Sequence, residues 1–219
     1  MQTTALATQT PLLGASGTSS HFISKRLLDV AASGIALLLI SPIFLLVGLC
    51  IRIDSKGSIF FSQNRIGLNE KAFKFWKFRS MVTDAEQPQK GMGQQNEMNG
   101  GVLFKMRDDT RITQVGRFNR RYSIDELSQL WNVFIGDMSL VGPRPALPNE
   151  VKQYNEYQKQ RLMSVPGITC IWQVSGRSNI PFIEQVEMDL EYIRKQSTSL
   201  DLLLLLNTVP AVLSSEGAY

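Results

Sequence analysis

The longest apolar segment of the chain lies near its start. Val30 to Ile51 are 22 residues without a charge, and as a helix they extend about 33 Å, enough to cross the hydrocarbon core of a bilayer. A plain transmembrane helix is therefore one interpretation. Ser41 and Pro42 at the centre of the segment oppose it, because proline removes a backbone donor and clashes with the preceding turn.

Basic residues flank this apolar segment on both sides. Lys25 and Arg26 precede it, and Arg52 and Lys56 follow it. Because positively charged flanks favour the cytoplasmic side of a membrane, both ends of the segment are expected on the same side. A re-entrant helix-hairpin that is broken at Ser41-Pro42, and that enters and leaves one leaflet, satisfies both the charges and the proline.

The pattern divides the chain into three parts. Residues 1–20 carry no charge and are rich in Thr, Ser, Gln, Ala and Gly, which predicts a disordered leader over residues 1–21. The re-entrant membrane helix is expected at 22–55. The third part, residues 56–219, is expected to be a cytoplasmic domain at the membrane surface.

Within the third part, the pattern predicts a small β-hairpin followed mainly by helices. Ile59–Phe61 and Phe73–Phe78 are aromatic-rich and β-prone, and Asn64–Glu70 is expected as the turn between them. Residues 84–101 are polar and read as a loop, with a substrate-ordered lid as the alternative. The expected fold class is thus predominantly α with a small β-hairpin.

Three later segments have helical character. Residues 149–163 are polar and charged and read as one helix, and Phe182–Gln196 reads as an amphipathic helix with Val186, Leu190 and Ile193 on its buried side. The leucine-rich run 202–213 is too short to cross a bilayer. It is interpreted as core, with a membrane-interfacial helix as the alternative.

Residues 117–145 hold the densest candidate chemistry. Ser123 and Glu126 have the spacing of a capping box, so a helix is expected to begin at Ser123 with Asp125 and Glu126 in its first turn. The apolar residues that follow at helical spacing are Leu127, Leu130, Trp131 and Phe134. An acidic first turn is common in helices, so a purely structural role is the alternative interpretation. A helix start that follows Arg120 also suits a phosphate or a metal ion.

Arg144 lies between two prolines, Pro143 and Pro145, which restrict the backbone on both sides of it. A guanidinium held in this way suits two-pronged phosphate recognition. A rigid turn with an exposed arginine is the alternative. Arg161, on the expected polar helix, is predicted to tolerate replacement by lysine with little effect.

The distribution of charge and the small numbers of histidine and cysteine residues limit the classes of function that the chain can have. Residues 52–121 carry fourteen Lys and Arg against seven Asp and Glu, which indicates an anionic partner such as phosphates, a lipid surface or nucleic acid. The membrane segment disfavours nucleic acid. The single histidine, His21, argues against a Ser-His-Asp triad, a His-rich zinc site and the His-Asp motif of glycerolipid acyltransferases. Two cysteines without metal-type spacing predict neither a zinc site nor a disulfide framework.

Taken in order, these motifs resemble those of the monotopic polyprenyl-phosphate phosphoglycosyl transferases, the bacterial sugar transferase family that initiates exopolysaccharide and O-antigen synthesis. The resemblance covers about residues 22–219. The motifs that carry it are Lys25-Arg26 with Asp29, Ser41-Pro42, Lys77-Phe78-Arg79-Ser80-Met81, Asp125-Glu126 after Arg120, Leu140-Val141-Gly142-Pro143-Arg144-Pro145, and Pro166-Gly167.

The resemblance implies a catalytic domain over residues 56–219 and assigns roles within it. Asp125 matches the family nucleophile, which forms a covalent phosphosugar intermediate, and Glu126 completes the catalytic dyad. A Mg²⁺ ion lies at this dyad in the family. Arg120 and Arg144 match arginines that bind substrate phosphate, and Lys77 and Arg79 match basic residues that are expected to do the same.

The implied reaction transfers a hexose-1-phosphate from a UDP-sugar to undecaprenyl or another polyprenyl phosphate and releases UMP. The implied location is the bacterial inner (cytoplasmic) membrane, with the catalytic domain facing the cytoplasm and a homo-oligomer as a further expectation. One alternative is a membrane-associated glycosyltransferase that releases UDP, although the chain lacks the Asp-x-Asp motif typical of such enzymes. Another is a non-catalytic membrane-anchored binding module.

Overall fold

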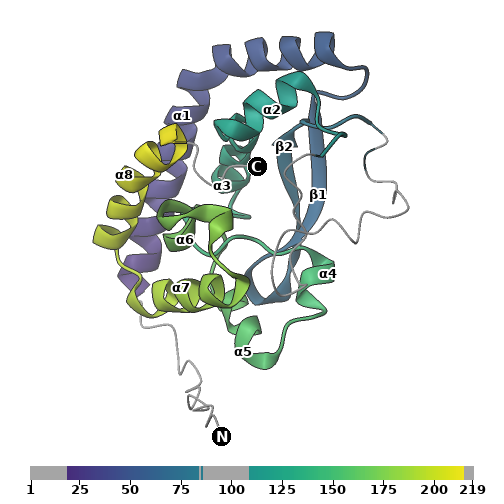
Figure 1. Ribbon diagram of the computed structural model, residues 1–219. Coiled ribbons are helices and arrows are strands. Elements are labelled where there is room, and N and C mark those ends of the chain that lie inside the picture. The colour runs from purple at the N-terminus through teal and green to yellow at the C-terminus, as the bar shows by residue number, and fades with distance from the viewer. Residues whose placement is uncertain (1–18, 84, 86–108, 215–219) are drawn as a thin grey trace, which may run out of the picture.

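The computed structural model describes residues 19–83, 85 and 109–214. The described chain is mainly helical, with two small two-stranded sheets (Figure 1). The expected fold class is thus confirmed in its predominantly α character and its hairpin. The expected loop at 84–101 lies outside the described residues except for Ala85. The expected leader lies outside as well, apart from residues 19–21, which already belong to the first helix.

The first helix, α1 (Ser19–Asp54), contains 36 residues and continues through Pro42. Figure 1 shows it turning between its purple first part and its blue second part, as expected where proline interrupts the ladder of hydrogen bonds. Ser41 Oγ donates to Leu38 O at 2.8 Å in this region. The expected break is therefore a bend within a continuous helix, not an interruption of it.

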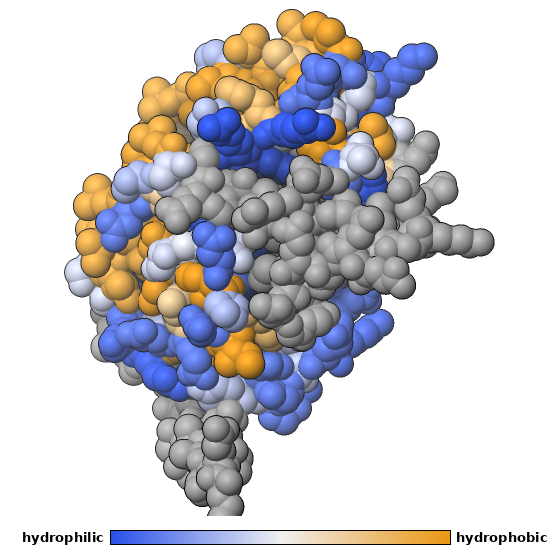
Figure 2. All heavy atoms as spheres, viewed as in Figure 1, coloured by the Kyte–Doolittle hydropathy of each residue, from blue (hydrophilic) through white to orange (hydrophobic). Residues whose placement is uncertain are grey.

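Most of the apolar surface of α1 has no protein to pack against. Leu38, Leu39, Leu45 and Ile53 are each more than 70% exposed. Figure 2 shows hydrophobic residues along the upper and left edge of this view, over α1 and α8 (Thr198–Ser214). By length and composition α1 is apolar enough to cross a membrane. So large an exposed apolar surface marks a membrane or protein contact.

Both ends of α1 are attached to the same folded body. At the C-terminal end, Val47 and Ile51 pack against Phe78, and Asp54 accepts a hydrogen bond from the backbone of Val115 at 3.2 Å. At the N-terminal end, the helix contacts α3 (Gln129–Ile135), the strand β3 (Ser139–Val141) and α8. The bend allows the two ends of this one long helix to contact the same folded body.

The predicted hairpin is confirmed. Strands β1 (Phe60–Ile66) and β2 (Ala72–Phe78) pair antiparallel from Phe60↔Phe78 to Ile66↔Ala72. The turn is shorter than predicted, because Asn64 still pairs with Lys74 inside the sheet. A short 3₁₀ helix, Leu68–Glu70, makes the turn.

The second sheet pairs β3 with β4 (Gly167–Thr169) in parallel. The two strands approach so closely that a Cβ atom on Gly167 would lie 2.0 Å from the backbone nitrogen of Gly142. Only glycine fits there. The sheet thereby joins the Pro166-Gly167 segment to the loop that carries Arg144, far apart in sequence.

The remaining helices all follow the hairpin in the chain. Besides α3 and α8 they are α2 (Gln114–Arg121), α4 (Pro148–Val151), α5 (Glu156–Lys159), α6 (Ile171–Ser175) and α7 (Phe182–Lys195), with 3₁₀ helices at Ile124–Glu126, Gln160–Met163 and Arg177–Asn179. The prediction for α7 is confirmed, since Val186, Leu190 and Ile193 are buried in the main core cluster.

Two helix predictions need correction. The single helix expected over 149–163 is three short helices, because Tyr154 turns inward and Asn155 caps α5 by accepting from Gln158 N at 2.9 Å. In α8, Leu204 is buried, but Leu206 and Leu213 are about 70% exposed. The core interpretation therefore holds only for the face of α8 that carries Leu204, and the interfacial alternative stays a prediction.

Candidate active site

The backbone around Asp125 and Glu126 differs from the predicted helix start. Ser123 adopts a left-handed conformation with φ of 54°, makes no capping hydrogen bond, and precedes a 3₁₀ turn at Ile124–Glu126. The regular helix α3 begins only at Gln129. The capping-box prediction is wrong because the carboxylate of Glu126 is engaged by two cations from other elements. A strained non-glycine conformation next to such a pair is typical of functional sites.

Helix α3 also buries a different face from the predicted one. Gln129, Asn132 and Val133 are buried, whereas Trp131 is 50% and Phe134 38% exposed. The reason lies in β2: Asn132 Oδ1 accepts from Trp76 N at 3.2 Å, and its Nδ2 donates to Lys74 O at 2.7 Å. This amide holds α3 and the preceding dyad against the strand that carries Lys77.

Lys77 and Arg144 converge on the two acidic side chains. Lys77 Nζ lies 2.9 Å from Glu126 Oε1 and 3.4 Å from Asp125 Oδ2. Arg144 Nη1 donates to the same Glu126 oxygen at 3.2 Å. Arg120 is held nearby, since its Nε donates to Ser80 Oγ at 3.0 Å. The structure thus brings together five of the predicted site residues from four separate segments.

The two carboxyl groups have opposite pKa shifts. Burial, together with the charge of Glu126, raises the pKa of Asp125 against the attraction of Lys77. Burial also acts to raise the pKa of Glu126, but Lys77 and Arg144 outweigh it and hold that pKa well below its usual range. Glu126 is thus the fixed anion of the pair, and Asp125 is the carboxylate whose charge depends on its cationic neighbours.

These groups line a cavity of about 540 Å³, a size usual for small-molecule sites. Seven cationic and four acidic side chains line it, so the cavity favours an anion. Lys77, Arg120, Asp125, Glu126 and Arg144 all belong to its wall. The wall continues to residues of α8, including Leu205 and Thr208, next to the exposed apolar surface.

Arg79 is the predicted phosphate-binding residue that the structure places elsewhere. It is 7% exposed, and its guanidinium donates to Ser55 O at 2.7 Å and to Lys56 O at 2.8 Å. It does not belong to the cavity wall. Its geometry matches a structural role at the C-terminal end of α1, where free carbonyl groups attract a cation.

Arg161, which the sequence placed on a polar helix, is buried in the structure. It is 5% exposed, forms an ion pair with the fully buried Asp189, and donates to Tyr154 OH at 3.1 Å. The short helices at 148–163 turn this side chain inward, so a near-neutral effect of Arg161→Lys is no longer expected. The sequence carries no local signal for a partner 28 residues away.

Arg65 and Arg177 also belong to the cavity wall and were not predicted. Arg177 follows Gly176 and has a left-handed backbone with φ of 53°. The Ser-Gly-Arg-Ser turn was the available signal for Arg177. Arg65 ends a β-strand and carried no distinguishing signal.

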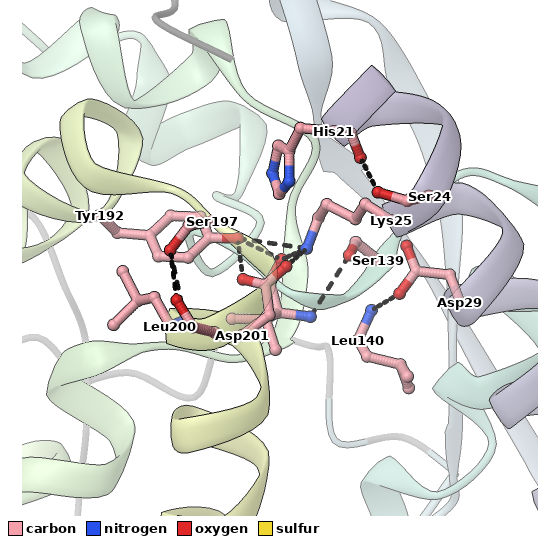
Figure 3. Close-up of polar contacts among 12 residues, drawn as sticks. His21, Ser24, Lys25, Asp29, Ser139, Leu140, Tyr192, Ser197, Leu200 and Asp201 are labelled. Carbon is pink, nitrogen blue, oxygen red and sulfur yellow. Dashed lines mark hydrogen bonds and ion pairs between the residues drawn. The ribbon is translucent and has the colours of Figure 1, made fainter. Parts of the chain in front are cut away.

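Lys25 and Arg26 are more than charged flanks of a membrane segment. Lys25 Nζ donates to Asp201 Oδ2 at 2.6 Å and to Val141 O at 2.9 Å, and Tyr192 OH donates to Asp201 Oδ1 at 2.7 Å (Figure 3). Arg26 donates to the carbonyl oxygens of Val133 and Phe134 at the end of α3. This network fixes α1 to β3 directly before the loop that carries Arg144.

Asp125 and Glu126 are the candidate ligands for a divalent cation. Among the residues that the structure describes, no three His, Cys, Asp or Glu side chains gather into a metal-binding group. Mg²⁺ commonly uses one or two carboxylates together with substrate phosphates and water. Two adjacent carboxylates in a cavity that favours anions therefore fit Mg²⁺ in the presence of a phosphate substrate, with Lys77 as their present partner.

Three related proteins illustrate the similarity of this chain to known ones. It is 48% identical over 200 residues to "Galactosyl transferase CpsE" of Streptococcus agalactiae, covering 91% of this chain and 44% of that protein. It is 38% identical to "Exopolysaccharide production protein ExoY" of Sinorhizobium fredii, covering 90% and 88%. It is 36% identical to "UDP-glucose:undecaprenyl-phosphate glucose-1-phosphate transferase" of Klebsiella pneumoniae, covering 95% and 44%.

The chain thus spans less than half of the first and third relatives and most of the second. The family model described as bacterial sugar transferase matches residues 20–215, which include α1, the dyad and α8. The segment that carries the long apolar helix and the segment that forms the cavity are therefore parts of one family unit. On these matches, the chain belongs to the bacterial sugar transferase family.

Proposed function

We propose that this protein transfers a hexose-1-phosphate from a UDP-sugar to polyprenyl phosphate and releases UMP, as the first membrane step of exopolysaccharide or O-antigen synthesis. The observation that carries the proposal is the buried dyad of Asp125 and Glu126, held by Lys77 and Arg144 in a cavity with more cationic than acidic side chains in its wall. The names of the Klebsiella pneumoniae and Sinorhizobium fredii relatives agree with the reaction and with the pathway.

In the proposed first step, the carboxylate of Asp125 attacks the phosphorus that bears the sugar. A bond from phosphorus to Asp125 forms, and the bond to the bridging oxygen of the pyrophosphate breaks. UMP leaves with that oxygen and its electron pair. Arg144 and Lys77 stabilise the negative charge in the transition state, which is the main means of catalysis in phosphoryl transfer.

In the second step, an oxygen of polyprenyl phosphate attacks the same phosphorus. The bond to Asp125 breaks, the free carboxylate is restored, and a polyprenyl diphosphate sugar is formed. Glu126, which Lys77 and Arg144 hold as an anion, is the candidate to assist this step by keeping these two cations in place beside the reacting phosphorus. Splitting one transfer into two through a carboxylate is a known form of covalent catalysis.

A Mg²⁺ ion held by Asp125 and Glu126 would supply further neutralisation of the pyrophosphate charge. Lys77 would then lie beside the metal site and not between the carboxylates. Arg120 remains a candidate phosphate ligand through the part of its guanidinium that Ser80 does not engage.

The product nucleotide tests the reaction. Purified full-length protein is incubated with Mg²⁺, undecaprenyl phosphate and a panel of UDP-hexoses, and the products are identified by mass spectrometry. We expect a lipid diphosphate sugar together with UMP. A lipid monophosphate sugar together with UDP would support the alternative glycosyltransferase instead. Family membership makes the non-catalytic membrane-anchored module the weaker alternative.

We further propose that α1 re-enters the cytoplasmic face of the bacterial inner membrane without crossing it. Both ends of the helix bind one folded body, through Lys25 at the start and Asp54 at the end. A helix that crossed the bilayer would place these ends on opposite sides. The bend near Pro42 and the exposed leucines of both halves support insertion into a single leaflet. A homo-oligomer stays a prediction.

Cysteine labelling tests this topology. Single cysteines at positions 20 and 58 are introduced after the exposed Cys50 is replaced by serine, and spheroplasts are treated with a membrane-impermeant maleimide. We expect both positions to be protected in spheroplasts and labelled after lysis. Labelling of one position alone in intact spheroplasts would mean that α1 crosses the membrane.

A further inference from the structure

Arg65, at the end of β1, has a guanidinium that lies in the cavity wall. Its Nη1 donates to Pro145 O at 3.1 Å, and its Cζ lies 5.2 Å from the ring centre of Phe75. The next residue, Ile66, donates from its backbone to Ala146 O at 2.9 Å. The hairpin and the loop that carries Arg144 are therefore joined at this point. The same contacts fix the orientation of the Arg65 guanidinium before any ligand binds.

The charge of Arg65 is not neutralised by an ion pair among the described residues. Its Nε atom is buried and has no hydrogen-bond partner in the part of the chain that the structure describes. Two other arginines of the cavity wall differ, since Arg161 is paired with Asp189 and Arg111 with Asp109. A buried donor without a partner is costly, and this one leaves the guanidinium of Arg65 without a protein acceptor at Nε among the described residues.

Arg144 adds a second positive charge close to Arg65. Burial and the neighbouring charge of Arg144 lower the pKa of Arg65 to about 10, so both side chains are cationic at neutral pH. The carboxylate that Arg144 contacts, Glu126, is shared with Lys77. Two guanidinium groups near each other in a buried cavity repel, and an anion between them would remove that repulsion.

We propose that Arg65 and Arg144 form a phosphate subsite in this cavity, and that Arg65 is a substrate-binding residue. Planar guanidinium groups bind tetrahedral phosphate through paired N–H donors. The phosphate is either the one that UMP retains or that of polyprenyl phosphate, two sources with the same chemistry. The phosphate subsite itself does not depend on the proposed function. Only the assignment of its phosphate to UMP or to polyprenyl phosphate rests on that function.

The test compares Arg65→Gln with Arg117→Gln. Arg117 is an exposed arginine of α2 outside the cavity wall, so its replacement removes the same charge elsewhere. Binding of UMP, of inorganic phosphate and of a short-chain polyprenyl phosphate is measured by calorimetry on the full-length protein in detergent micelles. For Arg65→Gln we expect a roughly tenfold to hundredfold loss of affinity for inorganic phosphate and for one of the other two probes. The affected probe identifies the source.

Arg65→Lys keeps the charge and the reach to Pro145 but loses the planar fork. We expect it to bind phosphate with an affinity between those of the wild type and Arg65→Gln, and to unfold at the wild-type temperature. Unchanged binding of all three probes by Arg65→Gln would overturn the proposal, and so would equal losses in Arg65→Gln and Arg117→Gln. If the Arg65-dependent loss is seen in a protein that makes no lipid product, the proposed reaction fails and the phosphate subsite stands.

Discussion

Asp125→Asn abolishes sugar-phosphate transfer and leaves the protein folded: this is the largest effect that we expect from a single substitution. An amide of the same shape cannot attack phosphorus, and removal of a nucleophile commonly lowers turnover by about 10⁴-fold or more. The fold is preserved because Lys77, the ion-pair partner of Asp125, keeps its 2.9 Å contact with Glu126. Burial also disfavours the charged form of Asp125, so loss of its charge costs little stability.

The measurement for Asp125 is a single-turnover assay without acceptor. Wild-type protein with UDP-hexose and Mg²⁺ is expected to release about one equivalent of UMP per active site, as covalent catalysis requires. Asp125→Asn should release none, while its circular dichroism spectrum and melting temperature match those of the wild type. Glu156→Gln is the matched control, since this carboxylate is 90% exposed on α5. A normal burst from Asp125→Asn would show that another residue is the nucleophile.

The pH dependence of the burst follows from the same geometry. Burial, partly offset by Lys77, raises the pKa of Asp125 above that of an ordinary aspartate. Since only the carboxylate attacks, the burst rate should fall as the pH drops through this raised pKa, at a higher pH than for an exposed aspartate. Rate measurements between pH 4 and pH 8, a range chosen around ordinary carboxylate values, report this midpoint.

Arg144→Lys is expected to lower kcat/KM by roughly a hundredfold or more, far beyond a conservative exchange. Pro143 and Pro145 restrict the loop, and Arg144 Nη1 already contacts Glu126 at 3.2 Å. The fork of the guanidinium can hold this carboxylate and a phosphate at the same time. A lysine ammonium is a single point charge, so one of the two contacts is lost. Steady-state kinetics with UDP-hexose and polyprenyl phosphate measure the effect.

The control for Arg144 is Arg117→Lys, which should change kcat/KM less than twofold because this side chain is exposed outside the cavity wall. Arg161→Lys is unsuitable, since Arg161 is buried in its pair with Asp189. Breaking such a pair changes stability as well as activity. Equal kinetics for the Arg144 and Arg117 variants would argue against a fixed phosphate contact at Arg144.

The local pattern of apolar and polar residues was sufficient to predict the strands and helices whose buried residues recur at regular spacing. The aromatic-rich, β-prone segments of β1 and β2 and the apolar stripe of α7 both appear in the structure. In each case the neighbouring element packs on one face, so the periodicity of the sequence reports the buried side. Pro42 likewise marks the bend of α1, because the effect of proline on a helix is local.

Prediction from the local pattern was wrong where a residue far away in the sequence forms a hydrogen bond or an ion pair with a residue of the predicted helix. Ser123 and Glu126 have capping-box spacing, but Lys77 and Arg144 engage Glu126, and the helix begins later. The apolar stripe predicted for α3 failed in a similar way, because Asn132 pairs with the backbone of β2. Hydrogen bonds of buried polar groups outweigh helix-start preferences worth about 1 kcal/mol.

The residue types of the site, the Asp-Glu pair, the arginines and the apolar helix with its central proline, are properties of the sequence and could be identified from it. Their grouping is a property of the tertiary structure. Lys77 reaches the dyad from 48 residues away, Arg65 reaches Pro145 from 80, and Lys25 reaches Asp201 from 176. Contacts between residues so far apart produce no periodic pattern in the sequence. They depend on burial and on the summed charges of neighbours, which exist only once the elements have packed together.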